Sequence, residues 1–232
     1  MKVKKISIII PCYNEEKTIN LVLKKVLNYK KYETEIILVN DGSTDGTSKI
    51  IQEYNEKNII ITNHDNNFGK GKAIYTGIKL ATGEIVLIQD ADLEYSPDDY
   101  DILLKPFEEA DADVVYGSRF IGGGSYVRLH YYFHYLANKI LTNLCNLFTN
   151  LNMSDMETGY KVFKRDVIKS INLKEQSFGI EPEITIKLAK KKYKFFEVGI
   201  SYRGRSYSEG KKITAKDAFI ALYCIFKYGF FS

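Results

Sequence analysis

The first hundred residues alternate short β-branched runs with helical segments, and this alternation constrains the fold more than any other feature. Apolar runs typical of buried strands cover residues 6–10, 35–39, 58–62 and 84–89. Each run is followed by turn and cap residues, and then by apolar positions at helical spacing. The alternation predicts an α/β fold with a mainly parallel central sheet and helices on both faces.

Three local patterns indicate where helices of this first half begin. Asn14 is expected to cap a helix whose apolar positions lie between residues 19 and 27. A glycine-rich turn leads into a helix over residues 70–81. Residues 96–99 combine a serine cap, a proline at the first helical position and acids in the first turn, so they begin another helix.

The pattern changes after the first hundred residues. Further strands are expected at 112–116, 160–163 and 195–200, and helices at 129–148, 182–192 and 215–231. The sequence shows no repeat, low-complexity tract or linker, so we expect a single domain over residues 1–232. Within it we distinguish a nucleotide-binding half (1–92), an acceptor half (93–212) and a C-terminal interfacial helix (213–232).

Composition excludes several classes of protein. Hydrophobic residues make up 45% and charged residues 27% of the 232 residues, which is an ordinary globular mixture. No apolar run approaches the roughly 18 residues that span a bilayer, and the N-terminus lacks a signal-peptide cleavage pattern. Cys12, Cys145 and Cys224 are too few and too far apart for a disulfide framework or a cysteine-based zinc site. A reducing cytoplasm is therefore the expected compartment.

The net charge of +4 hides a marked asymmetry. Residues 81–120 contain eleven acidic and two basic residues, whereas residues 160–232 contain sixteen basic and seven acidic residues. An acidic middle suits a metal ion, and a basic end suits an anion or an anionic surface. Because the sequence has neither a dense basic patch nor a known nucleic-acid module, we do not expect nucleic acid as a partner.

The acidic pair of Asp90 and Asp92 is the sharpest chemical feature. It follows a buried strand, and open α/β sheets bind ligands beyond the carboxyl ends of their strands. Two carboxylates so spaced can bind one hard cation, with Glu94 as a candidate third ligand. Mg²⁺ or Mn²⁺ bound in this way completes its coordination with waters and substrate phosphates. The alternative is an acidic turn that only closes the strand.

Neither familiar phosphate-binding loop is present. Residues 69–72 read Gly-Lys-Gly-Lys without the Ser or Thr that follows in a P-loop, and no GxGxxG follows the first strand. A P-loop NTPase and an NAD enzyme are therefore disfavoured. Residues 11–15 and 40–43 lie at the ends of two strands, where they can line a base and ribose pocket. Residues 67–72 bring cations, including Lys72, to a helix N-terminus, which favours phosphate.

Several short motifs occur in one order between about Ile6 and Ile213. They are Ile-Pro-x-Tyr-Asn-Glu-Glu, Asn-Asp-Gly-Ser-Thr-Asp-Gly-Thr, Gly-Lys-Gly-x-Ala, Asp-Ala-Asp-Leu-Glu, Gly-Ser-Arg, Glu-Thr-Gly-Tyr-Lys and Glu-Gly-Lys-Lys. This order resembles the family 2 glycosyltransferases, and more narrowly the dolichol- and polyprenol-phosphate mannose synthases. The resemblance implies a GT-A fold, which is Rossmann-like, a nucleotide-sugar donor, a divalent metal and a lipid-phosphate acceptor.

The resemblance also assigns roles by position. The donor-binding residues that the resemblance implies are Pro11, Tyr13, Glu15, Asp41 and Asp90. We add Lys72 to them because it lies near a helix N-terminus. The candidate metal ligands are Asp90, Asp92 and Glu94, the last standing where many relatives have Gln or Ser. The candidate catalytic residues are Asp92, Arg119 and Arg205, and the candidate acceptor-binding residues are Arg128, Ser208 and Lys211.

The expected reaction follows from the charge of the acceptor. A phosphate monoester has a second pKa of about 6, so a lipid phosphate is mostly dianionic at neutral pH and needs no strong general base. The metal neutralises charge on the departing nucleoside diphosphate. The acceptor phosphate can be bound by arginine side chains, for which the candidates are Arg119, Arg128 and Arg205. The family implies inversion at the anomeric carbon. We therefore expect an enzyme that moves a hexose, first of all mannose from GDP-mannose, to a polyprenyl or dolichyl phosphate.

Several alternatives stay open. The donor could be UDP-glucose or another nucleotide sugar, and the acceptor a saccharide. A nucleotidyltransferase would need a glycine-rich loop after the first strand, and a non-catalytic subunit would not need the intact Asp-Ala-Asp. Asp155 and Glu157 could orient the acceptor, act as base or only shape a turn, whereas Glu181 and Glu183 suit a structural role at a helix start.

The sequence also predicts a membrane surface as a partner. The helices expected at 129–148 and 215–231 are rich in aromatic residues, and lysines lie near the second. Aromatic and cationic side chains together are typical of an interfacial helix. Because the sequence lacks the C-terminal membrane helices of many relatives, it resembles the peripheral type, expected at the cytoplasmic face of a membrane. A membrane-anchored partner subunit is a further candidate.

Overall fold

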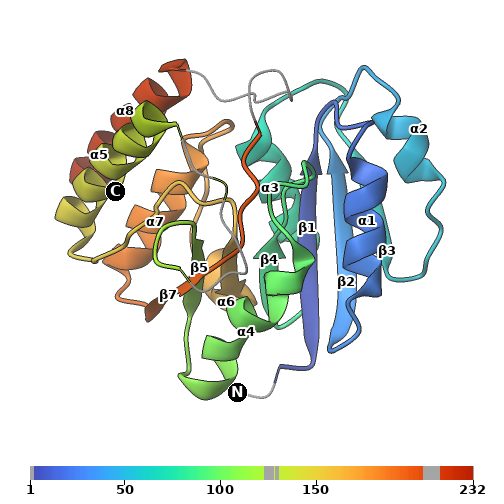
Figure 1. Ribbon diagram of the computed structural model, residues 1–232, viewed down its shortest axis with the longest axis horizontal. Helices are drawn as coiled ribbons and strands as arrows, with labels where there is room; N and C mark the ends of the chain where they lie inside the picture. The colour runs from blue at the N-terminus through green and yellow to red at the C-terminus, as the bar shows by residue number, and fades with distance from the viewer. Residues whose placement is uncertain (1–2, 123–127, 129–130, 206–214, 232) are drawn as a thin grey trace.

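A computed structural model describes residues 3–122, 128, 131–205 and 215–231. A seven-stranded sheet in the order β3-β2-β1-β4-β6-β5-β7 forms its centre (Figure 1). The strands are β1 (Lys5–Cys12), β2 (Glu33–Asn40), β3 (Ile59–Asn63), β4 (Ile85–Ile88), β5 (Val114–Ser118), β6 (Lys161–Lys164) and β7 (Phe195–Gly199). Only β6 is antiparallel to its neighbours, β4 and β5, among these strands. The predicted α/β fold with a mainly parallel sheet is confirmed.

Helices cover both faces of the sheet. They are α1 (Ile19–Asn28), α2 (Thr47–Gln52), α3 (Lys70–Leu80), the 3₁₀ turn η1 (Pro97–Asp99), α4 (Tyr100–Glu109), α5 (Tyr132–Thr149), α6 (Arg165–Lys169), α7 (Ile180–Lys190) and α8 (Ala215–Phe231). One core joins α1, α2 and α4 to the sheet, and the other joins α3, α5, α6, α7 and α8 to the opposite face. Side chains alternate along β1, so Ile8 and Ile10 enter the first core and Ile9 the second.

Local signals located some helix boundaries and missed others. The Ser96 side chain accepts a hydrogen bond from the Asp98 amide ahead of η1 and α4, as predicted. The prediction that Asn14 caps the first helix is wrong, because α1 begins after Thr18. Asn14 instead has a left-handed φ of 51°, which asparagine tolerates, and its side chain accepts the amide of Thr44 at 2.8 Å. It therefore connects the loops that follow β1 and β2.

No helix in the described ranges is long and apolar enough to span a bilayer. Helix α8 has two apolar sides. Ala221, Cys224, Ile225 and Tyr228 are buried in the core, whereas Phe219 and four further aromatic side chains of the helix are exposed. From the sequence, this helix could pack in the core or lie exposed at the surface. The structure shows both: one side of α8 packs in the core, and the other side is exposed.

Candidate functional site

A cleft of about 800 Å³ opens at the carboxyl ends of β1, β2 and β4. The last residues of β1 and the loops after these strands supply the first part of its wall: Pro11, Cys12, Tyr13, Glu15, Asp41, Asp90, Ala91, Asp92 and Glu94. The loop before α3 adds Asn67 and Gly69, and α3 adds its first residue, Lys70. The sequence motifs that were expected to bind a nucleotide sugar thus come together, because parallel strands direct their carboxyl ends to one edge of the sheet.

Arg205 closes over the acidic end of this cleft. Its Nη2 lies 2.7 Å from Oδ2 of Asp92, and its Nε lies 3.3 Å from Oε1 of Glu94. Tyr202 donates its hydroxyl to the other oxygen of Glu94 at 2.8 Å. Burial and the charges of Glu94 and Asp90 raise the pKa of Asp92 to about 7, against the opposing charge of Arg205. Asp90, Asp92 and Glu94 thus repel one another, and the positive charge of Arg205 partly offsets this repulsion.

Asp90 and Asp92 suit a divalent metal ion whose remaining ligands are substrate phosphates and waters. In the described ranges, no group of three or more His, Cys, Asp or Glu side chains is arranged to hold a metal ion. Mg²⁺ and Mn²⁺ nevertheless need only one or two protein carboxylates when phosphates and waters complete the shell. The repulsion that raises the pKa of Asp92 is the kind that a cation relieves. Glu94 holds Tyr202 and Arg205, and its role as a third ligand stays a prediction.

Lys70, the first residue of α3, is the cation that pairs with Asp90, as Arg205 pairs with Asp92. Its Nζ lies 2.9 Å from Oδ1 of Asp90 and 3.4 Å from Oε1 of Glu181. Lys72 is not among the described residues that line the cleft, and its Nζ lies 5.6 Å from the centre of the Tyr75 ring. The predicted phosphate-side cation is therefore better matched by Lys70 than by Lys72.

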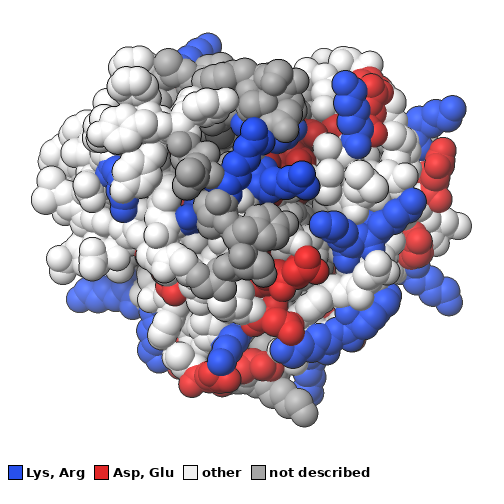
Figure 2. Space-filling model, viewed as in Figure 1, with Lys and Arg blue, Asp and Glu red and all other residues white. Residues whose placement is uncertain are grey.

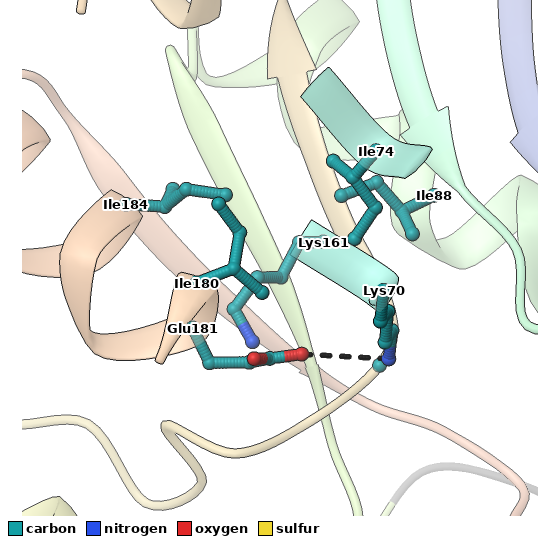
Figure 3. Close-up of a pocket in the computed structure, with 8 residues that line it drawn as sticks. Lys70, Ile74, Ile88, Lys161, Ile180, Glu181 and Ile184 are labelled. Atoms are coloured by element: carbon teal, nitrogen blue, oxygen red, sulfur yellow. Dashed lines mark ion pairs between the residues drawn. The ribbon is translucent and has the colours of Figure 1, made fainter. Parts of the chain in front are cut away.

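A small cavity of about 10 Å³ lies behind Lys70, between α3, β4, β6 and α7 (Figure 3). Lys161 from β6 and Glu181 from α7 point toward each other at its floor. Lys161 is 2% exposed, and its Nζ donates hydrogen bonds to the carbonyl oxygens of Met156 and Thr158. This lysine therefore fixes the turn that precedes β6.

Two buried carboxylate oxygens of the cleft have no hydrogen-bond partner among the described residues. They are Oε1 of Glu157 and Oε2 of Glu181. Burial, and then the charge of Glu181, raise the pKa of Glu157 to about 8. Such acceptors are costly to bury unless a ligand or a water satisfies them. The sequence favoured a structural role for Glu181, which the structure places in the cleft wall.

Arg119 also lines the cleft, and its guanidinium is held by Asp155. Its Nε and Nη2 each donate to Asp155 at 2.7 Å. Asp155 is fully buried, and although burial opposes its ionisation, Arg119 holds the pKa of this carboxyl below its usual value. The amide of Asn138 adds a third contact at 3.1 Å. Asp155, whose role the sequence left open, thus orients the guanidinium of Arg119.

Asp41 and Arg128 take less direct positions. Asp41 lines the cleft, and its carboxylate also accepts the amides of Phe68 and Gly69 at 3.1 and 2.7 Å, so it shapes the loop before α3. Arg128 is exposed, is absent from the described cleft wall, and donates from Nη1 to the Gly204 carbonyl at 2.9 Å. The predicted acceptor residues Ser208 and Lys211 lie outside the described residues.

The sheet order, the strand-end cleft and the acid pair define a GT-A glycosyltransferase fold. The chain belongs to glycosyl transferase family 2, whose family model matches residues 7–171. The fold and the family expected from the sequence motifs are thereby confirmed, and so is the broad activity of a glycosyltransferase.

Relatives in other organisms are similar to this chain over most of its length. Over 219 residues the chain is 33% identical to the uncharacterized protein MJ0544 of Methanocaldococcus jannaschii, covering 88% of this chain and 93% of that protein. It is 30% identical to the dolichyl-phosphate beta-glucosyltransferase ALG5D of Trichomonas vaginalis, covering 85% of this chain. It is 27% identical to the undecaprenyl-phosphate 4-deoxy-4-formamido-L-arabinose transferase of Photorhabdus laumondii, covering 90% of this chain. The chain spans 65% and 63% of the lengths of these last two proteins.

Solved structures show the same fold. Glucosyl-3-phosphoglycerate synthase from Mycobacterium tuberculosis, in complex with Mn²⁺, UDP and phosphoglyceric acid, superposes with a TM-score of 0.74 at 18% identity. The match covers 99% of this chain and 80% of that one. The same synthase with Mg²⁺ and UDP gives a TM-score of 0.71 at 18% identity, over 97% of this chain and 79% of that one.

Proposed function

We propose that this protein transfers a hexose from a nucleotide sugar to a polyprenyl or dolichyl phosphate at a membrane surface, with Mg²⁺ or Mn²⁺. The observation that carries the proposal is the arrangement of one cleft. Asp90 and Asp92 lie at the end of β4, with Lys70 beside Asp90 and Arg205 beside Asp92. Arg119 lines the same cleft. Such a site suits two anionic substrates, one of them through a metal.

The donor would occupy the strand-end part of the cleft. Pro11, Tyr13, Glu15 and Asp41 would surround the nucleoside, and Asp90 with Asp92 would hold the metal. When bound, the metal would supply Lewis-acid stabilisation of the diphosphate leaving group. Lys70 begins an 11-residue helix, so its ammonium group and the helix N-terminus would favour phosphate together.

The identity of the donor has two candidates. The sequence resemblance favours GDP-mannose. UDP-glucose is the second candidate, because a relative at 30% identity is described as a beta-glucosyltransferase and the solved structure of similar fold was obtained with UDP. The carboxylate oxygens of Glu157 and Glu181 that have no partner among the described residues would accept hydrogen bonds from sugar hydroxyls in either case.

The chemistry we propose is a single displacement. A phosphate oxygen of the dianionic lipid attacks the anomeric carbon, the bond to the nucleoside diphosphate breaks, and the configuration inverts. Arg119, held by Asp155, would orient the attacking phosphate with a preorganised guanidinium. Arg205 would exchange its ion pair with Asp92 for the incoming phosphate, as guanidinium binds both anions bidentately.

The exposed apolar sides of α5 and α8 supply the proposed membrane contact. These helices lie side by side at one edge of the molecule, where Figure 1 shows them in yellow-green and red. Phe148 joins the two sides, since its ring centre lies 5.7 Å from Phe226 and 4.9 Å from Phe230. The most exposed large apolar side chains here are Tyr132, Phe133, Leu147, Phe219, Tyr223, Phe230 and Phe231. A contiguous apolar surface of this kind marks an interaction site.

This apolar surface reaches the mouth of the cleft. Phe133 and Phe219 line the cleft, although they are 80% and 72% exposed. A phosphate bound at Arg119 would therefore have an apolar exit for its prenyl chain between α5 and α8. Charged side chains gather over the centre and right of the face in Figure 2, and the part over α5 and α8 is largely uncharged.

The proposal is tested by incubating the protein with Mn²⁺ or Mg²⁺, a panel of nucleotide sugars and short polyprenyl phosphates. We expect a lipid-linked hexose in mass spectrometry with one donor of the panel. The control omits the metal. Formation of free sugar or a glycosylated saccharide, with no lipid product from any donor, would contradict the lipid acceptor.

A further inference from the structure

The loop before α3 rests on a second segment, residues 174–178, that comes from the other half of the chain. The carbonyl oxygen of Gln176 accepts the amide of Lys72 at 3.0 Å. A Cβ atom added at Gly69 would lie 2.6 Å from that same oxygen, so the two backbones are in close contact. Ser177 and Phe178 continue from this contact into the cleft wall. The position of the segment thus determines where the donor-side loop lies.

Helix α8 holds the same segment from its other side. Oε1 of Glu175 accepts the ammonium of Lys227 at 2.7 Å and the hydroxyl of Tyr228 at 2.6 Å. Although burial opposes ionisation, these two donors hold the pKa of Glu175 below its usual value. Tyr228 is 4% exposed and therefore is a fixed partner in the core.

A different acid fixes the backbone of the segment. Glu183, which is fully buried in α7, accepts the amides of Lys174 and Glu175, each at 2.8 Å. It also pairs with Lys187 at 2.5 Å. Glu183 therefore holds the backbone at the start of the segment, and it also contacts the Tyr228 hydroxyl. Glu175 connects the segment to α8 through its own side chain.

Building on the proposed function, we propose that Glu175 is a positioning residue for the nucleotide-sugar site, connecting α8 to the start of α3, where Lys70 lies. The connection runs from Lys227 and Tyr228 through Glu175 and Gln176 to residues 69–72. Because Lys70 is the cation beside Asp90, a displaced segment would misplace the group that faces the donor phosphates. Arg119 and Asp155 hold each other directly, so acceptor binding depends less on this segment.

The connection has a consequence for the membrane surface. The buried side of α8 contacts Glu175, and its exposed side forms the proposed membrane contact. A shift of α8 relative to the core would therefore also change the shape of the donor site.

The test measures binding of UDP and of GDP, each with Mn²⁺, by calorimetry on the full chain. Glu175→Ala removes the contacts with Lys227, Tyr228 and the thiol of Cys224 on α8, and we expect the Kd of the bound nucleotide to rise on the order of tenfold. Glu175→Gln keeps an acceptor for the Tyr228 hydroxyl and should give a smaller rise. Tyr228→Phe removes the hydroxyl that contacts Glu175 and also Glu183, and it provides a second, milder variant should Glu175→Ala fail to fold.

Lys190→Met is the matched control. Lys190 donates to the carbonyl oxygens of Tyr228 and Gly229 at 2.8 and 3.0 Å, so its loss loosens α8 without removing the contact to Glu175. We expect less than a twofold change in nucleotide Kd for this variant. In turnover, Glu175→Gln should raise the KM of the donor and leave the KM of the lipid phosphate unchanged.

The outcomes separate the inference from the proposed function. Nucleotide binding that is equal in the wild type, Glu175→Gln and Tyr228→Phe would overturn the role of Glu175 alone. Equal losses in Lys190→Met and the Glu175 variants would overturn it too, because general loosening of α8 would then suffice. A wild-type protein that binds neither nucleotide with Mn²⁺ would overturn the proposed function, and the inference with it.

Discussion

The guanidinium Nη2 of Arg205 lies 2.7 Å from Oδ2 of Asp92, although 113 residues separate them in the chain. An arginine near the C-terminal end of the chain thus pairs with an acid that follows β4. The same guanidinium reaches Glu94 at 3.3 Å and Glu15 at 3.7 Å. These ion pairs therefore join two distant parts of the chain across the cleft, and the proposed anionic substrates would compete for them.

Asp92→Ala should abolish sugar transfer and leave the fold intact. The carboxylate serves the proposed metal, and its removal should lower turnover by at least about a hundredfold. Stability should change by no more than about 1 kcal/mol, because the lost ion pair with Arg205 is offset by relief of repulsion from Glu94 and Asp90. Product formation and thermal unfolding check this, with the exposed Glu53→Ala as control. Turnover above a tenth of wild type would contradict the metal assignment.

Arg205→Ala should harm use of the acceptor more than binding of the donor. The variant loses the guanidinium that we expect to hold the lipid phosphate, so the KM of the acceptor should rise on the order of tenfold or more. Arg205→Lys keeps the charge without the planar fork and should recover only part of the activity. Calorimetry with UDP or GDP and Mn²⁺ measures the affinity for the nucleotide part of the donor. An equal collapse of donor affinity would show that Arg205 serves both substrates.

The paired change Phe219→Ser and Tyr223→Ser should weaken binding to anionic liposomes. These side chains are 72% and 64% exposed on one side of α8, so their loss removes apolar contact with the bilayer and leaves the core unchanged. High salt should weaken binding further, since each nearby lysine contributes roughly 1 kcal/mol at an anionic surface. Sedimentation at two salt concentrations measures both effects.

Two controls make the liposome experiment specific. Leu21→Ser removes an exposed apolar side chain from α1, which covers the other face of the sheet, and should bind like the wild type. Ile225→Ser alters the buried side of α8 and should lower the free energy of unfolding. Deletion of α8 is unsuitable, because it would remove both sides of the helix. Wild-type binding by the paired variant would contradict the membrane role of α8.

Glu35 should make stability depend on pH in the acid range. This carboxylate is 6% exposed and accepts the hydroxyls of Ser7 and Thr82, each at 2.6 Å. Burial opposes ionisation, but these hydrogen bonds outweigh it and lower the pKa of Glu35 from its ordinary 4.5. A lowered folded-state pKa stabilises the fold above about pH 4.5, and this stabilisation is lost as the pH falls through the folded value.

Urea unfolding of Glu35→Gln measures this effect. The variant should be less stable than the wild type by about 2 kcal/mol at pH 7, and the difference should shrink as the pH falls below about 4.5. Glu33→Gln, at a side chain that is 71% exposed, is the matched control and should change little. A difference that grows toward low pH would show that the hydrogen bonds do not favour the ionised form of Glu35.

The sequence by itself determined the elements and the chemistry of the strand ends. Buried parallel strands need continuous apolar runs and helices need periodic ones, so β1, β2 and β4 could be located from composition and spacing alone. Helix α8 was predicted over residues 215–231, the same bounds that the structure gives. Asp90 and Asp92 were predicted at the cleft because a residue that directly follows a parallel strand has its place fixed by local structure.

Only the tertiary structure decided which of several similar residues faces the cleft. Lys70 and Lys72 lie two positions apart in α3, so their side chains point about 200° apart around the helix, and packing selects Lys70. Glu181 lines the cleft, while Glu183 is used to hold the segment that carries Glu175.

The contacts between distant segments were also beyond the sequence. The pairing of Arg205 with Asp92 and the antiparallel direction of β6 depend on how the second half folds back onto the first. Local periodicity records which face of an element is buried, but it does not record which element will cover that face. That choice is made by packing between elements far apart in the chain, and it is this packing that builds the site.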